Sequence, residues 1–137
     1  MKKHLYLLFI IISLVITSCT SAGKLEFIVA TSSEECPMVI DEVTTCVDIF
    51  TENKNVVYKC TFDEDEAGIY LSKMDNLEYR KVQKKIMLEY LKKSKYSDEE
   101  VREMINLCKD AKYDIIYRFI GTVTGYKYEI VLSSHEL

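Results

Sequence analysis

The chain has 137 residues, of which 48% are hydrophobic, with 18 basic and 22 acidic side chains and a formal net charge of −4. This length suits one domain that can bury a sizeable core. The acidic balance excludes a protein that binds nucleic acid or an anionic bilayer through a basic surface.

Residues 1–18 have the form of a secretory signal. Lys2 and Lys3 precede an apolar run from Leu5 to Ile16. A basic start, a short apolar core and small residues at a cleavage site are typical of an export signal. The run is shorter than the roughly 20 residues that a stable transmembrane helix needs, so we expect it to be removed.

Cys19 is the candidate lipidation site. Residues 16–19 read Ile-Thr-Ser-Cys, which resembles the lipobox of bacterial lipoproteins. The resemblance implies cleavage before Cys19, acylation of its sulfur by palmitate-like chains, and Thr20 in second position suggests the outer membrane. An ordinary signal cut near Ala22 is the alternative. Because each buried methylene contributes about 0.8 kcal/mol, two or three acyl chains would hold a small domain at the membrane permanently.

After the signal, the sequence predicts a short polar tether at residues 19–24 and a single domain over residues 25–137. Loss of Lys2 and Lys3 with the signal lowers the net charge to near −6. Residues 25–35 are interpreted as a short helix, although the central part also suits a strand. The proline that follows ends this segment, because it disfavours helix in the preceding residue.

A β-hairpin is predicted next. Residues 43–50 and 56–62 alternate in polarity with period two, and residues 52–55 form a polar turn between them. This alternation is typical of half-buried strands joined by a tight turn.

The register of this hairpin decides which cysteines can meet. A turn of two or four residues places Val47 opposite Cys60 and Ile49 opposite Tyr58, with the more apolar positions on one face. A three-residue turn would place Cys46 opposite Cys60 and bury an aspartate. Since one residue of slip moves every side chain to the other face, we favour the first register, which argues against a Cys46–Cys60 bond.

The acidic run at residues 63–68 is interpreted as a solvated turn. A calcium loop of the EF-hand type would need ligands where Ala67 and Met74 stand. Charged turns of this kind usually face water.

Two helices follow. Residues 73–93 are strong helix formers without glycine or proline. Their apolar stripe is assigned to the core: Tyr79, Val82, Ile86 and Tyr90, widened by Leu77, Leu88 and Leu91. The second helix is predicted to begin at a capping box over residues 97–100. Its buried face contains Val101, Met104, Ile105 and Cys108.

The chain closes with a second hairpin. Residues 113–120 and 126–132 alternate around a turn bracketed by Gly121 and Gly125. The predicted fold class is therefore α+β: a four-stranded antiparallel sheet of two β-hairpins, with the helix pair between them packed on one face.

Four cysteines remain after Cys19, an even number that suggests two disulfides in an exported domain. The predicted bonds are Cys60–Cys108, between two apolar faces, and Cys36–Cys46. Free buried thiols are the alternative. No C-x-x-C pair indicates a zinc or redox site.

At this point the chain resembles a group of small lipoproteins from Bacteroidetes-like bacteria. The matching features are the lipobox, the segment Cys-Pro-Met-Val-Ile-Asp at residues 36–41, Thr44-Thr45, Val56-Val57-Tyr58 and the hairpin around Tyr117. The resemblance implies an envelope location and an α+β architecture, and it carries no catalytic residues.

The sequence predicts binding rather than catalysis. Its two histidines are His4, in the signal, and His135, near the end. No phosphate-binding loop or metal-ligand spacing is present, so we expect no enzyme activity and no cofactor. Tyrosines of the closing hairpin are candidates for either a binding surface or the core: Tyr113, Tyr117, Tyr126 and Tyr128.

Three functions fit these observations. The first is a lipid-anchored envelope module that binds an unknown protein or envelope component through one sheet face. The second is a periplasmic inhibitor or immunity-type protein, whose acidic charge would suit a basic enzyme. The third is a hydrolase with an unrecognised site built on His135.

Overall fold

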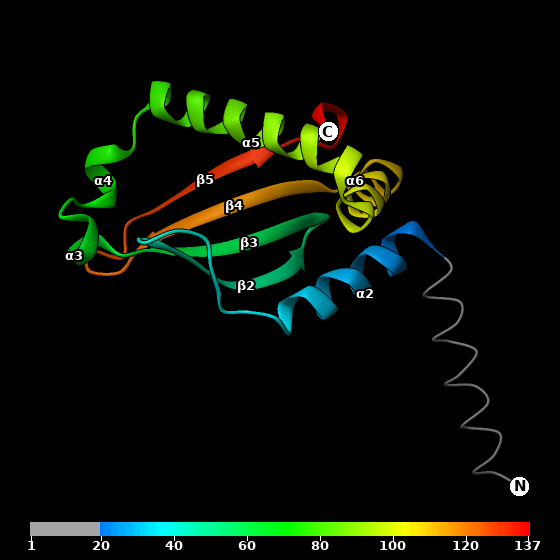
Figure 1. The fold of residues 1–137 in the computed structure, drawn as a ribbon, viewed down its shortest axis with the longest axis horizontal. Helices are drawn as coiled ribbons and strands as arrows, with labels where there is room; N and C mark the ends of the chain where they lie inside the picture. Colours follow the sequence, from blue (N-terminus) through cyan, green and yellow to red (C-terminus); the bar gives the residue numbers. More distant parts are fainter. Residues whose placement is uncertain (1–19) are drawn as a thin grey trace, which may run out of the picture.

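The structure is a computed structural model that describes residues 20–137 (Figure 1). The signal and the candidate lipidation site Cys19 lie outside the described residues. The described elements, in chain order, are α2 (Ser21–Ser33), β1 (Met38–Val39), β2 (Thr44–Glu52), β3 (Asn55–Phe62), α3 (Glu64–Ala67), α4 (Leu71–Met74), α5 (Leu77–Ser97), α6 (Glu99–Ala111), β4 (Asp114–Gly121), β5 (Lys127–Leu132) and the 3₁₀ turn η1 (Ser134–Glu136).

The predicted mixed α+β class is confirmed, but the predicted four-stranded antiparallel sheet is wrong. The five strands have the order β1-β2-β3-β4-β5, and β3 and β4 are parallel. The helices between these two strands return the chain to the end where β3 began. A connection of that length allows parallel pairing, whereas a tight turn does not. The short β1 adds an edge strand beside β2.

The helix α2 begins inside the predicted tether. Thr20 is its N-cap, and the Thr20 hydroxyl accepts a 2.9 Å hydrogen bond from the Gly23 backbone N–H. Such a cap satisfies one of the unpaired donors at a helix start. Leu25 and Val29 then anchor the helix in the core. Residues 21–24 of the predicted tether are therefore helical, and α2 packs into the core from Leu25 onward.

A β-bulge in β2 makes the predicted register right at one end and wrong at the other. Ile49 pairs with Tyr58, as expected, but the register shifts between Cys46 and Asp48, so that Cys46 faces Cys60. The extra residue is Val47. A bulge places two residues opposite one and therefore moves the following side chains to the other face.

The helix boundaries also differ from the prediction. Residues 73–93 were predicted as one helix, but α4 and α5 are separate, and the Asn76 side chain caps α5 by accepting from the Tyr79 N–H at 2.9 Å. The predicted capping box is replaced by Asp98, which accepts from the backbone of Glu100 and Val101. Because α5 continues through Ser97, that serine cannot act as the cap.

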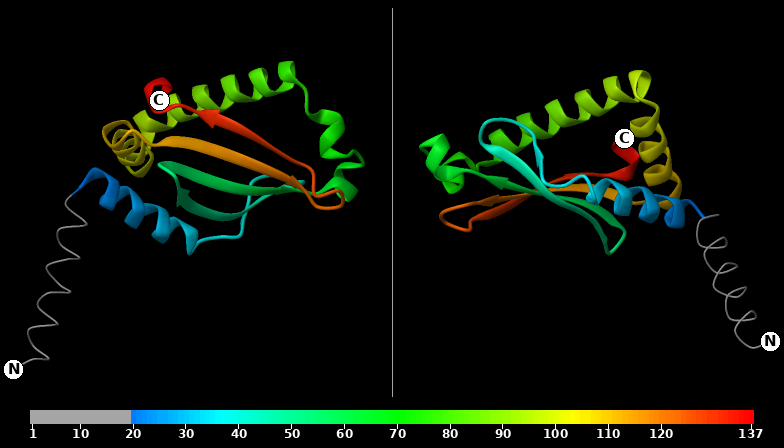
Figure 2. Two further views of the ribbon diagram at one scale, coloured as in Figure 1. Left: turned by 180° about the vertical axis from the view of Figure 1, so that it is seen from behind. Right: turned by 60° about the horizontal axis from the view of Figure 1, so that its bottom comes forward.

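All three long helices pack on one face of the sheet. Figures 1 and 2 show α5 beside β5, α2 beside β2, and α6 at one end of the sheet, where it touches both α2 and α5. The fully buried side chains of this single core are Leu25, Leu71, Ile105, Ile115, Leu132, Val56, Cys46 and Cys108.

Candidate functional site

Five large apolar side chains on α5 face water: Leu77, Val82, Ile86, Tyr90 and Tyr96. Val82, Ile86 and Tyr90 are 56%, 60% and 70% exposed, and we call them the α5 stripe. They are spaced four residues apart, so they lie on one side of the helix over successive turns. The prediction that they belong to the core is therefore wrong. Leu91 is the α5 residue that is buried instead.

Polar contacts determine this orientation of α5. Arg80 forms a bidentate ion pair with Asp75, with 2.6 Å between Nη2 and Oδ2, and its guanidinium lies 5.2 Å from the centre of the Tyr128 ring. Gln83 accepts from the Tyr128 hydroxyl at 3.0 Å, and Lys84 pairs with a C-terminal glutamate at 3.0 Å. Positions 80, 83 and 84 share one helix face, so these contacts turn the opposite flank outward.

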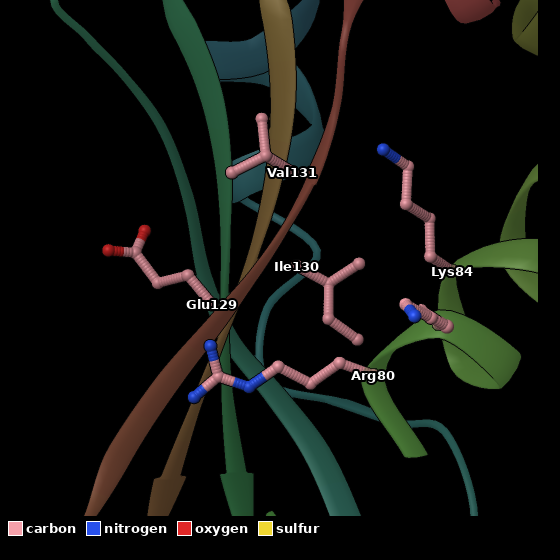
Figure 3. A pocket seen from close by; sticks show the side chains of 6 residues that line it. Arg80, Lys84, Glu129, Ile130 and Val131 are labelled. Atoms are coloured by element: carbon pink, nitrogen blue, oxygen red, sulfur yellow. The ribbon is translucent and has the colours of Figure 1, made fainter. Parts of the chain in front are cut away.

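The ion-paired flank borders a groove between α5 and β5 (Figure 3). This groove has a volume of about 260 Å³. Figure 3 shows Ile130 pointing from β5 toward the helix, between Arg80 and Lys84. Both cations already have carboxylate partners in Asp75 and Glu136. The groove is therefore a poor anion site, since an anion would have to displace these partners.

Two aromatic residues of the sheet pack under the helices. The rings of Tyr58 and Tyr117 stack with 5.0 Å between their centres, and the Tyr58 hydroxyl lies 3.2 Å from the Met104 sulfur. Burial, Cys60 and Cys46 raise the pKa of Tyr117.

The tyrosines proposed as a binding surface do not form one together. Tyr113 and Tyr128 are buried in the core, and Tyr117 is half-buried under the helices. Tyr126 is the exposed member, and its hydroxyl donates a 2.6 Å hydrogen bond to Asp75. Their hairpin thus mostly supplies packing, while the exposed surface comes from α5.

The surroundings of the stripe are cationic although the chain is acidic. Helix α5 carries seven basic and two acidic side chains. Six of the basic residues are lysines: Lys81, Lys84, Lys85, Lys92, Lys93 and Lys95. Arg80, Lys81 and Lys84 are ion-paired with carboxylates. Among the described residues, the α5 lysines without such a partner are Lys85, Lys92, Lys93 and Lys95, and their charge would attract acidic partners.

The other face of the sheet is left uncovered by the described helices. Its register aligns an apolar row of Phe50, Val57, Ile116 and Val131 beside a charged row of Asp48, Lys59, Arg118 and Glu129. Val57 is fully buried within this row, and Val131 is its exposed member. Arg118 pairs with Glu52 and Glu129 and lies over the Phe50 ring. Charged side chains interrupt the apolar surface here, so this face fits a partner less well than the α5 stripe does.

The acidic run contains a buried carboxylate that the sequence did not reveal. Glu64 is 2% exposed and accepts hydrogen bonds from the backbone N–H groups of Leu71, Val123 and Thr124 at 2.8–3.0 Å, and from the Thr124 hydroxyl. Burial raises the pKa of Glu64, but these hydrogen bonds outweigh it and hold the pKa below its usual value. The carboxylate therefore links α3 and α4 to the β4–β5 turn.

The described cysteines are free thiols: Cys36, Cys46, Cys60 and Cys108. Because of the bulge, Cys46 faces Cys60 rather than the opposite side of the sheet. The predicted pair Cys36–Cys46 is in hydrogen-bond contact, whereas Cys60 has Cys46 as its neighbour instead of Cys108.

Two further results limit the chemistry of residues 20–137. This part of the chain holds no group of three or more histidine, cysteine, aspartate or glutamate residues placed to bind a metal ion. Among its helices, none has both the length and the apolar character of a membrane span.

Comparison with known proteins identifies relatives of the fold. Neither a protein-family model nor a curated protein matches this sequence. A Pseudomonas aeruginosa protein described as a candidate secreted protein has a similar structure, with a TM-score of 0.56, 14% identity, and coverage of 85% of this chain and 91% of the other.

Two type II secretion system pilotins are also similar in structure. EpsS of Vibrio vulnificus has a TM-score of 0.53, 11% identity, and 85% and 94% coverage of the two chains. AspS of Vibrio cholerae has a TM-score of 0.50, 10% identity, and 85% and 95% coverage. At these identities the likeness concerns the fold.

Proposed function

We propose that this chain is a lipid-anchored, non-enzymatic interaction protein of the cell envelope that binds a partner protein through the α5 stripe. The exposure of Val82, Ile86 and Tyr90 in the middle of the longest helix carries the proposal. Apolar side chains gathered on one surface are costly to keep in water, and such patches mark interaction sites.

The chemistry around the stripe favours an acidic, amphipathic helix as the partner segment. The stripe runs from Val82 to Tyr90, or about 12 Å along the helix axis. This length suits two or three apolar anchors spaced one helical turn apart. The net positive charge of α5 would attract acidic residues beside those anchors. A second copy docking by the same helix would bring two cationic surfaces together.

This charge argument also separates the proposal from the inhibitor alternative. A basic enzyme target would be repelled by α5, although the rest of the chain is acidic. An acidic partner matches the α5 surface, which combines exposed apolar and cationic side chains.

Three observations support the envelope location and a pilotin-like role. The lipobox at residues 16–19 implies an anchor on Cys19. The resemblance to small Bacteroidetes-type lipoproteins agrees with that anchor. The fold is shared with two pilotins of type II secretion systems and with a candidate secreted protein. We therefore propose that the chain is attached to the outer membrane and binds a component of an envelope protein complex there.

Site-specific photo-crosslinking in cells tests the docking surface. A photoreactive residue in place of Ile86 should give a discrete crosslinked species, and changing Lys85, Lys92 and Lys93 to glutamate should abolish it. A photoreactive residue at Val39 is the matched control, because Val39 is an exposed apolar residue on β1, at the opposite edge of the sheet from β5. Equal crosslinking from both positions, or none from Ile86, would contradict the proposal.

The anchor is tested separately by fractionation. Cys19→Ala should prevent acylation, so that the processed domain appears in the soluble envelope fraction. If the processed variant remains bound to membranes as fully as the original chain, lipid anchoring is wrong.

A further inference from the structure

Three thiols that are distant in the sequence form a row at one side of the sheet. Cys36 follows α2, Cys46 lies in β2 and Cys60 lies in β3. Cys46 and Cys60 are register partners, and Cys36 lies two residues before Met38, whose register partner is Cys46, and packs against the core that contains Cys46. Cys46 is therefore the middle sulfur, within reach of either neighbour.

Access to this row is graded. Cys36 is partly exposed, whereas Cys46 and Cys60 are 1% and 4% exposed. The fourth described thiol, Cys108, is fully buried on α6. A molecule from solvent can therefore reach the row first at Cys36.

We propose that this row is a thiol–disulfide exchange site whose substrate is a disulfide-bearing molecule. Cys36 is the entry thiol, Cys46 is the shared disulfide partner, and Cys60 is the resolving thiol. This site is independent of the docking surface on α5.

The reaction proceeds in three exchanges. The Cys36 thiolate attacks a disulfide R–S–S–R, forms a mixed disulfide and releases one R–S⁻. The Cys46 thiolate then attacks the Cys36 sulfur and releases the second R–S⁻, which leaves a Cys36–Cys46 bond. Two cysteines are oxidised, R–S–S–R is reduced to two thiols, and the protons of the two cysteines pass to the two leaving groups.

The third exchange is internal and involves no net oxidation. The Cys60 thiolate attacks the Cys46 sulfur, the Cys36–Cys46 bond breaks, and the proton lost by Cys60 is regained by Cys36. The product has a buried Cys46–Cys60 bond and a free entry thiol, which can react again. The bulge at Val47 makes this step possible, because it brings Cys46 opposite Cys60.

The surroundings of the three thiols single out Cys60 as the one whose thiolate is stabilised. The hydrogen bond from Cys46 lowers the pKa of Cys60, although burial opposes the shift. Burial and the neighbouring Cys46 raise the pKa of Cys36, and Cys60 and burial raise the pKa of Cys46, so the first two exchanges should be slower at neutral pH than at alkaline pH. A thiolate is the nucleophile in exchange, so the stabilised Cys60 thiolate suits the resolving role.

Oxidation of the reduced full-length protein by oxidised glutathione, followed by acid quenching and peptide mapping, tests the assignment. The original chain should form a transient glutathione adduct at Cys36, then Cys36–Cys46 and Cys46–Cys60 bonds. Cys46→Ser should trap the adduct, and Cys60→Ser should stop at Cys36–Cys46. Cys36→Ser should slow intramolecular oxidation about tenfold or more, because only buried thiols remain.

Cys108→Ser is the matched control and should leave the products and their rate unchanged. Oxidation of Cys36→Ser at the original rate, a Cys60–Cys108 product, or no adduct at Cys36 would overturn the proposal. If Cys46→Ser does not fold, as judged by circular dichroism, the Cys36 and Cys60 variants decide the outcome.

Discussion

The Glu64 site and the α5 stripe both have a solvent exposure that is unusual for their chemistry. Glu64 is a charged side chain withdrawn from solvent, and each carboxylate oxygen accepts hydrogen bonds from protein groups. The α5 stripe is apolar and exposed, with no helix or strand of residues 20–137 covering it. A buried charge whose hydrogen-bond partners all lie within the chain stabilises the fold, whereas exposed apolar side chains indicate a binding partner outside the chain.

The largest loss of stability is expected from Glu64→Ala. This change leaves three backbone N–H groups without acceptors, those of Leu71, Val123 and Thr124, and unpaired buried donors are costly. Urea unfolding should show a large drop in the transition midpoint. Glu66→Ala, on the exposed side of the same turn, is the control and should change the midpoint little. Equal effects of the two changes would show that the Glu64 site is not a structural clamp.

Gly121→Ala should be the next most harmful change at the Glu64 site. A Cβ at Gly121 would lie 2.3 Å from the Glu64 Oε1 atom, far inside contact distance. Overpacking of this kind costs about 1–3 kcal/mol. Gly125→Ala is the control for backbone strain, because Gly125 has a positive φ of 67° but open space around it.

Combining Gly121→Ala with Glu64→Ala sharpens this prediction. The clash involves the Glu64 carboxylate itself, so the double variant should lose less free energy of unfolding than the two single losses together. Simple additivity, measured by urea unfolding of all four chains, would place the clash elsewhere.

Acid should weaken the domain in a defined pH range. Burial raises the pKa of Glu64, but the backbone hydrogen bonds outweigh it and leave the pKa low, and the Arg80 hydrogen bond lowers the pKa of Asp75. A carboxyl with a depressed folded-state pKa contributes stability above its unfolded pKa, about 4, and loses it as the pH falls through the folded value.

Unfolding free energies measured from pH 7 downward should therefore be flat to about pH 5 and fall below it. Glu64→Gln should reduce this fall, because its side chain does not titrate. A variant with the full acid dependence of the original chain would contradict the role given to Glu64.

The parts of the fold that depend on local pattern could be predicted from the sequence. Period-two alternation was enough to find both hairpins, and helix formers without glycine or proline were enough to find α5. The parallel pairing of β3 and β4 could not be predicted, because it depends on the path of the helices between them. The bulge at Val47 was also hidden, since alternation continues to look regular on both sides of one inserted residue.

The candidate sites were harder to predict because their partners are distant in the chain. The stripe looked like a core face, since nothing local shows that Arg80 and Gln83 find partners on other elements. Glu64 lies in a run of acidic residues, which normally face water. Its carboxylate accepts hydrogen bonds from backbone N–H groups of the β4–β5 turn, which is distant in the chain. The row of three thiols follows from the register shift, so the sequence suggested the Cys36–Cys46 contact and missed Cys60.

The smallest effect on stability is expected where the effect on binding is largest. Ile86→Ser removes apolar surface that is already in water, so the free energy of unfolding should change by about 0.5 kcal/mol or less. Leu91→Ala, on the buried side of the same helix, should cost about 2–5 kcal/mol because it opens a cavity. Photo-crosslinking from the position of Tyr90, on the same stripe, should lose its product in Ile86→Ser. It should retain the product in Leu91→Ala at temperatures where that variant is folded. A loss of stability in Ile86→Ser as large as that in Leu91→Ala would mean that the stripe belongs to the core, and the contrast with the Glu64 site would fail.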